Sequence, residues 1–166
     1  MAIAVGLGIS SADQPGDQSC IRLVQPLELN EVWPRVSTWL MQHQEYWARY
    51  YALEDLYLML FCESERYQLW LVGEWRESFG CFITEIRRFP KCKVLVFLLA
   101  AAELDGQPKL GGGDFYHEHI TLWAHGQGVE YSRIEGREAW KRIGKSLGYT
   151  EVQVALTKSL AHTWRQ

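Results

Sequence analysis

The sequence lacks the features that mark several large classes of protein. Its four cysteines form no C-x-x-C pair, and their spacing does not suit a zinc site. Lys and Arg form no long run, and the net charge of −3 argues against a nucleic-acid-binding face. No apolar run approaches the ~20 residues of a membrane span, and the first residues lack the positive charge of a signal peptide. The sequence therefore predicts a cytoplasmic protein with free thiols that uses no metal and binds neither nucleic acid nor membrane.

Apolar and aromatic residues are abundant, at 48% and 13% of the chain, with eight Trp. A chain of 166 residues is long enough to bury about two-thirds of its unfolded surface as one domain. Residues 1–19 contain several Gly, Ser and Asp and show no periodic pattern, so we expect a flexible N-terminal arm. One compact domain is then expected over residues 20–166.

Hydrophobic patterning predicts ten elements in the order β-α-α-β-β-β-α-β-α-β. The stretch KVLVFLLAAA is nearly all apolar, as expected of a central strand that is buried on both faces. Asn30 is expected to cap the first helix, which continues to about Tyr50. This order predicts a layered α/β (α+β) fold, with a mixed sheet and helices on both faces. The expected ranges are 20–27, 30–50, 53–62, 68–73, 78–87, 92–101, 115–125, 131–135, 137–147 and 150–157.

The final third of the chain carries the clearest pattern, YSRIEGREAWKRIGKSLGYTEVQVALT. Gly148 is expected to end a helix in the left-handed conformation, between two strands. This arrangement resembles the end of the GNAT (N-acyltransferase) fold. It also resembles small GNAT-like proteins of bacteriophages and prophages, which carry a "WA…G…GR-x-x-W-x-R…LG-aromatic" signature. The matching residues are Trp123, Ala124, Gly128, Gly136, Arg137, Trp140, Arg142, Leu147, Gly148 and Tyr149.

The resemblance implies an enzyme that transfers an acyl group from acetyl-CoA to an amine. In that fold a glycine-rich loop and the following helix N-terminus hold the pyrophosphate, and a backbone N–H of the central strand stabilises the oxyanion. Here the loop reads KLGGGD, and Asp114 stands where a Gly or Ala is usual. Asp114 equally suits an ordinary helix cap, so a phosphate cradle and a capped loop both stay open. The implied cofactor-binding residues are Lys109, Gly111, Gly112, Gly113 and Leu98.

The resemblance also implies a general base and a general acid. Glu85, on an expected strand, is the candidate base, and an exposed glutamate paired with arginine is the alternative. Alignment on Leu147-Gly148-Tyr149 puts Gly144 where many GNAT enzymes carry a tyrosine that acts as the general acid. Tyr131 is therefore the candidate acid instead. His117 and His125 stand about 12 Å apart on one helix, too far for one ion, and we expect them on a polar helix surface.

Two classes of function remain open. The first is an acyl-CoA-dependent N-acetyltransferase. The second is a GNAT-like fold without catalysis that serves as a binding or assembly component, in a virion or against a host protein. A protein partner or a second copy could dock through residues 1–19 and the aromatic helices. The aromatic residues of the first helix also suit core packing or the wall of an acceptor pocket; they are Trp39, Tyr46, Trp47 and Tyr50.

Overall fold

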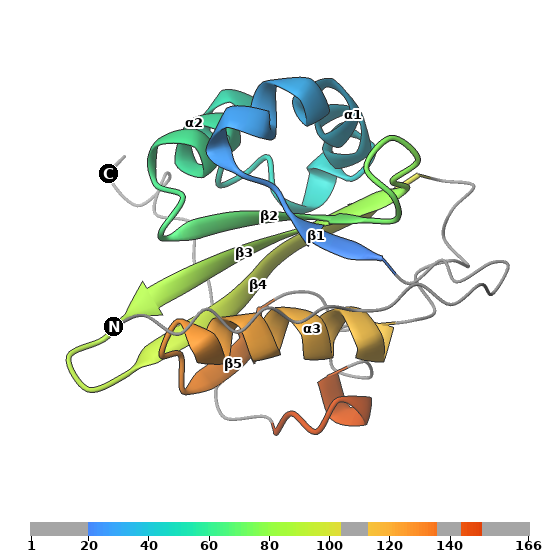
Figure 1. Ribbon diagram of the computed structural model, residues 1–166. Coiled ribbons are helices and arrows are strands. Elements are labelled where there is room, and N and C mark those ends of the chain that lie inside the picture. Colours follow the sequence, from blue (N-terminus) through green and yellow to red (C-terminus); the bar gives the residue numbers. More distant parts are fainter. Residues whose placement is uncertain (1–19, 104–112, 136–143, 151–166) are drawn as a thin grey trace, which may run out of the picture.

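The computed structural model describes residues 20–103, 113–135 and 144–150. Five strands form one sheet, with α1 and α2 over one face and α3 over the other (Figure 1). The predicted layered α/β fold is confirmed. The predicted arm, most of the last helix and most of the last strand lie outside the described residues. The elements are β1 (Ile21–Leu23), α1 (Leu29–Met41), α2 (Leu53–Cys62), β2 (Tyr67–Val72), β3 (Gly80–Arg88), β4 (Lys93–Ala102), α3 (Gly113–Gly126) and β5 (Tyr131–Ile134), with short 3-10 turns at Pro26–Glu28 and Gln44–Tyr46.

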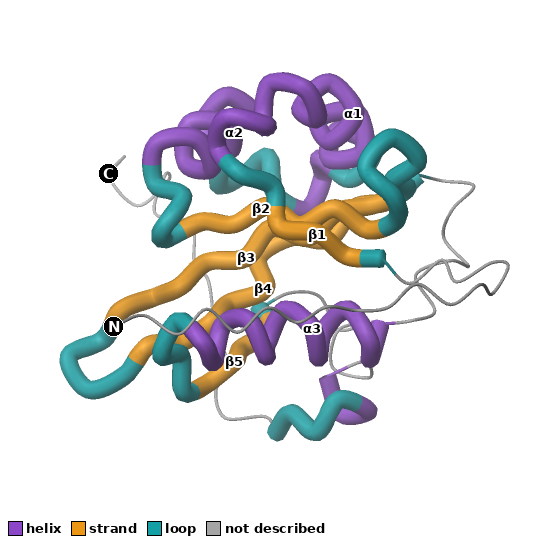
Figure 2. Tube along the Cα trace, in the orientation of Figure 1, coloured by secondary structure: helices purple, strands orange, loops and turns teal. Residues whose placement is uncertain are grey.

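The sheet has the order β1-β2-β3-β4-β5. The first four strands are antiparallel neighbours, so short turns can join most of them. β4 and β5 are parallel, and α3 supplies the crossover that a parallel pair requires (Figure 2). α3 therefore runs back along β4, and the Lys93 Nζ at the start of β4 donates to the carbonyl of Gln127 just after α3, at 2.8 Å.

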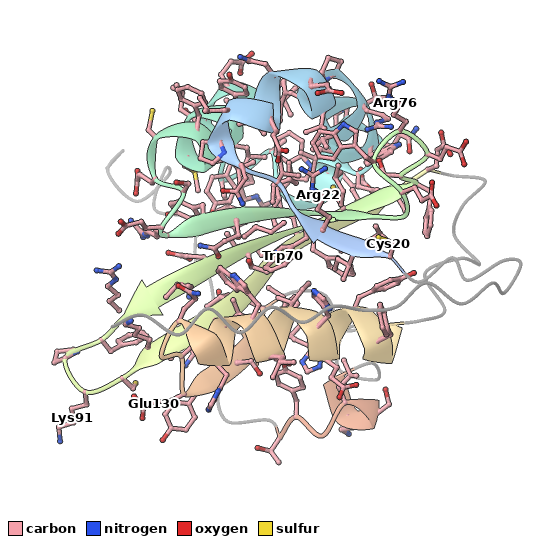
Figure 3. All side chains as sticks on the ribbon, viewed as in Figure 1. Cys20, Arg22, Trp70, Arg76, Lys91 and Glu130 are labelled. Atoms are coloured by element: carbon pink, nitrogen blue, oxygen red, sulfur yellow. The ribbon has the colours of Figure 1, made fainter. Side chains whose placement is uncertain are left out.

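Two apolar clusters hold the helical layers to the sheet. Alternation along β2 divides its side chains, because Leu69 and Leu71 face α1 and α2 whereas Trp70 faces α3. Figure 3 shows Arg22 and Trp70 on opposite sides of the sheet accordingly. The Trp70 ring meets the edge of Trp123 from α3, with centroids 5.0 Å apart. Buried aromatic area of this kind contributes a large part of the core stability.

α1 differs from its predicted range at both ends. It begins one residue before Asn30 and ends at Met41, well short of Tyr50. The cause is Trp47, which is buried and whose indole Nε1 donates to the Leu40 carbonyl at 2.9 Å. That bond satisfies a carbonyl of the last helical turn, so the chain folds back instead of continuing the helix. Of the alternatives left open for Trp47, the structure shows core packing, because the residue is 4% exposed and belongs to the cluster between the helices α1 and α2 and the sheet.

Candidate functional site

The pairing of β4 with β5 stops partway along β4, because β5 ends at Ile134. Their last paired residues are Phe97 and Ile134, yet β4 continues to Ala102. At the same level the register with β3 shifts, because Thr84 pairs with Phe97 and Ile83 pairs with Leu99. Leu98 is then the extra residue of a β-bulge, a feature that re-aims strands beside active sites. In the described part of the chain, no strand pairs with this edge of β4 beyond Phe97.

The helix α3 begins at the end of the sheet to which β4 continues beyond β5. Its first residue is Gly113, and the His117 ring lies over the Phe97 ring, with centroids 5.4 Å apart. The first helical turn therefore stands beyond Phe97, toward the end of β4, on the face opposite the Leu98 side chain. The N-terminus of a helix favours anions, so this end of the fold has the polarity that a phosphate group needs. Of the other implied cofactor residues, Lys109, Gly111 and Gly112 lie outside the described residues.

Three side chains form a hydrogen-bonded chain on the α3 face of the sheet. The Tyr149 hydroxyl donates to Ser132 Oγ at 2.7 Å and lies 2.6 Å from His117 Nε2. Because its single hydrogen goes to Ser132, the imidazole N–H is the donor to Tyr149. Burial raises the pKa of Tyr149, and the bond to Ser132 opposes that rise. His117 thus packs against the sheet, and its predicted place on a polar helix surface is wrong.

Replacing Tyr149 with Phe is expected to lower the free energy of unfolding by about 1–2 kcal/mol. The hydroxyl joins α3 to β5 through two hydrogen bonds, and the half-buried Ser132 Oγ loses this donor. Urea unfolding of the two proteins measures the change. Tyr131→Phe is the matched control, since the Tyr131 side chain is exposed. Equal losses in both variants would contradict this role of the Tyr149 hydroxyl.

The opposite face of the sheet carries a network of arginines and glutamates. The Glu85 side chain is only 4% exposed, and both of its oxygens bind guanidinium groups. Arg66 donates to Oε1 at 3.1 and 2.8 Å, and Arg87 donates to Oε2 at 2.7 Å. Arg87 also binds Glu135 Oε1 through its Nη1, at 2.7 Å. Glu85 is therefore a buried carboxylate held between two arginines, and its oxygens are occupied by them.

Tyrosines from two other elements approach the same network. Burial raises the pKa of Tyr51, and the charge of Glu85 adds to the rise, while Arg87 opposes it. The pKa of Tyr67 in β2 is also raised, with burial as the largest cause and the charge of Glu85 as the second. Tyr51 lies in the connection between α1 and α2, so the helical layer, β2, β3 and the end of β5 all meet around Glu85.

Tyr131, the predicted acid, lies apart from this meeting point. It pairs with Val94 at the start of β5, three residues or about 10 Å from the level of Ile134. Its side chain is 62% exposed. The structure joins Glu85 and Glu135 through Arg87 near the end of the β4–β5 pairing, and it does not bring Tyr131 to Leu98.

An open groove of about 810 Å³ borders the arginine network. It lies where α2 leads into β2 and where β3 ends. Among the described residues, no cluster of His, Cys, Asp or Glu is arranged to hold a metal ion. No helix in that part of the chain is long and apolar enough to cross a bilayer. The groove is lined by Cys62, Glu63, Ser64, Glu65, Arg66, Ile86, Arg87, Arg88 and Phe89.

Sequence reasoning missed Arg133, which lies within the β4–β5 pairing, and Glu135, which follows it. It also missed the contact of His117 with Tyr149 and the bond of Tyr149 to Ser132. The pattern Arg-x-Glu at the end of the expected strand could have indicated that Arg133 and Glu135 lie together, because residues two apart on a strand share one face.

No protein-family model matches the sequence, and no curated protein matches it. Solved structures do match the fold. An aminoglycoside acetyltransferase from an uncultured soil metagenomic sample, meta-AAC0020 in complex with sisomicin, aligns with a TM-score of 0.64 at 10% identity, over 86% of this chain and 97% of its own. The aminoglycoside N-acetyltransferase AAC(6')-Iy, in complex with the bisubstrate analogue CoA-S-monomethyl-acetylneamine, aligns with a TM-score of 0.62 at 10% identity, over 86% and 98%.

A GNAT family acetyltransferase of Staphylococcus aureus aligns with a TM-score of 0.60 at 14% identity, over 87% of this chain and 100% of its own. These likenesses establish that the chain has the GNAT acetyltransferase fold. At sequence identities of 10–14%, these likenesses show a shared fold and do not indicate the substrate. The resemblance to phage proteins and the docking of a partner through residues 1–19 stay predictions.

Proposed function

We propose that the protein is an N-acetyltransferase that takes its acetyl group from acetyl-CoA. The observation that carries this proposal is the end of the β4–β5 pairing beside the Leu98 bulge, with the N-terminus of α3 at the same end of the sheet. An unpaired strand edge can hydrogen-bond an extended ligand as a further strand would. The likeness to AAC(6')-Iy, whose structure contains a CoA-derived analogue, supports the same conclusion.

The described residues fit this cofactor. Among the described residues no strand pairs with the β4 edge from Leu98 onward, so its backbone N–H and C=O groups can meet a ligand, and the start of α3 offers an electropositive helix end for a phosphate. Bound acetyl-CoA supplies the activated thioester that an amine can attack. The backbone at Leu98 would then lie beside the reacting carbonyl, where an N–H can stabilise the developing negative charge.

We assign Glu85 a positioning role in this reaction. Its carboxylate holds Arg66 and Arg87 from both sides, and Arg87 in turn binds Glu135 at the end of β5. A buried charge of this kind costs less when it is fully hydrogen-bonded, which is the state of Glu85. Glu85 thereby fixes Arg87 and, through it, the carboxylate that stands closer to the open edge of β4.

Calorimetry with acetyl-CoA tests the proposal directly. We expect a Kd in the micromolar range and a rise in Tm with ligand concentration, because a ligand that binds the native state stabilises it. ATP serves as the control ligand, since it carries phosphates and adenine without the thioester arm. Absence of heat and of any Tm shift at about 100-fold higher acetyl-CoA would contradict the proposal. The protein would then be a GNAT-like binding or assembly component.

A further inference from the structure

We propose that Arg133 and Glu135 recognise an acceptor that carries its amino group close to an acid group, as a free amino acid does. This inference rests on the proposed function and names the substrate class of the same site. Its basis is a pair of opposite charges at the end of β5. Within the described structure, each side chain of the pair has hydrogen-bonding groups without a partner.

The pair stands at the level where the reaction would occur. β5 runs parallel to β4, and Ile134 is level with Phe97, so Glu135 follows at the level of the Leu98 bulge. Cross-strand partners share a face, so Arg133, opposite Val96, lies on the face of Glu85. Glu135 is two residues further and points to that face too, as its ion pair with Arg87 requires. Both side chains thus lie beside the point where the β4–β5 pairing ends.

Glu135 is held through one oxygen only. Its Oε1 accepts from Arg87 Nη1 at 2.7 Å and from Arg133 Nη1 at 3.4 Å. Within the residues that the structure describes, no hydrogen bond or ion pair reaches its Oε2. The side chain is 41% exposed, whereas that of Glu85 is 4% exposed. Of the two carboxylates, Glu135 is the one with a fixed position and an oxygen still available for an ammonium group.

Arg133 complements it with donors still available. Its guanidinium makes one long contact, from Nη1 to Glu135, and the side chain is 42% exposed. A guanidinium has five N–H donors in a fixed plane, which suits a carboxylate through two parallel bonds. In the described part of the chain, Nε and Nη2 of Arg133 have no partner. An acid group can bind there while a neighbouring ammonium binds Glu135.

The surrounding charge favours a zwitterion over a polycation. Arg66, Arg87 and Arg133 stand among the carboxylates of Glu63, Glu85 and Glu135, so the formal charges of the network balance. A polyamine or an aminoglycoside would bring several further positive charges to this face, and like charges repel. A ligand with one ammonium and one carboxylate adds no net charge, and each of its groups meets an opposite charge here.

The test uses the full chain, acetyl-CoA, the standard amino acids and their C-terminal amides, with release of CoA thiol as the readout. At least one amino acid should be acetylated with a kcat/KM about tenfold or more above that of its amide, which lacks the carboxylate. Amides that equal or exceed their amino acids would overturn the proposal. So would the absence of turnover of every amino acid by a protein that binds acetyl-CoA.

Variants separate recognition from a structural effect. Arg133→Gln should raise the KM for the amino acid about 10- to 100-fold and leave the KM for its amide unchanged, while Arg133→Lys should recover part of the loss. Glu135→Gln should raise the KM for both. Arg88→Gln is the matched control, because Arg88 is exposed and pairs with Glu65. An equal effect of Arg133→Gln on acid and amide would show a structural role and overturn the proposal.

Saturation-transfer NMR of the amino acids with the protein alone keeps the two proposals apart. Contact that Arg133→Gln abolishes supports the site even where acetyl-CoA does not bind, in which case only the proposed function fails. Acetyl-CoA binding without amino-acid contact or turnover would leave the proposed function standing and would overturn this site.

Discussion

Replacing Glu85 with Gln is expected to lower the free energy of unfolding by about 2–3 kcal/mol. Its carboxylate is buried and accepts three bonds from Arg66 and Arg87, so the neutral amide deprives each guanidinium group of one of its two carboxylate partners. Loss of one partner of a buried pair costs about 3–5 kcal/mol. We expect less here because the Arg66 side chain is 53% exposed and water replaces part of the interaction. Urea unfolding, with an unchanged m-value, measures the difference.

Glu63→Gln is the matched control for this experiment. Glu63 pairs with the same Arg66 at 3.5 Å, but both side chains are about half exposed. Its loss should therefore change the free energy of unfolding by less than about 0.5 kcal/mol. A Glu85→Gln protein of unaltered stability that has lost acetyl transfer would show that Glu85 is the general base, and our assignment of a positioning role would be wrong.

The second large effect is a loss of stability in alkali. Burial raises the pKa of the Cys81 thiol from 9.0 to about 12, although a backbone hydrogen bond to Ala101 opposes the rise. The unfolded chain ionises this thiol near pH 9, and the folded protein does so only near pH 12. Stability from Cys81 is thus fully present below pH 9 and falls as the pH rises from 9 to 12. The loss reaches about 4 kcal/mol at pH 12, since each unit corresponds to about 1.4 kcal/mol.

Urea unfolding between pH 7 and 11 measures this slope, and Cys81→Ala should flatten it. The buried phenols add to the remaining slope above pH 10, because burial also raises the pKa of Tyr51, Tyr67 and Tyr149. Cys62→Ala is the control, since Cys62 is exposed. A Cys81→Ala protein with the same alkaline slope as the unaltered chain would contradict the assignment to this thiol.

The sequence predicted those parts of the fold that depend on local pattern. KVLVFLLAAA became β4, an interior strand between β3 and β5, and Gly148 has φ +80, the left-handed value expected after a helix. The residues around Met41 do not by themselves indicate that α1 ends there. That end depends on Trp47 turning back to the Leu40 carbonyl, and neither Gly nor Pro stands there to indicate a stop.

The candidate site was less accessible to sequence reasoning because it depends on strand pairing. Glu85 could be singled out as a carboxylate on a strand, but only the register of β2, β3 and β5 puts Arg66, Arg87 and Glu135 around it. The Leu98 bulge follows from pairing with β3 and leaves no trace in an apolar run. Whether Lys109, Gly111 and Gly112 contact a cofactor stays a prediction.

The order of the strands also bears on synthesis at the ribosome. β1 to β4 pair only with neighbours in the chain, so the first 103 residues contain the whole antiparallel meander together with the α1–α2 layer. The other face of that meander, with Trp70, Ile86 and Phe97, is covered by α3, which emerges later. A nascent chain of this length exposes an apolar sheet surface until α3 has been synthesised. Chaperones would be needed most during that interval.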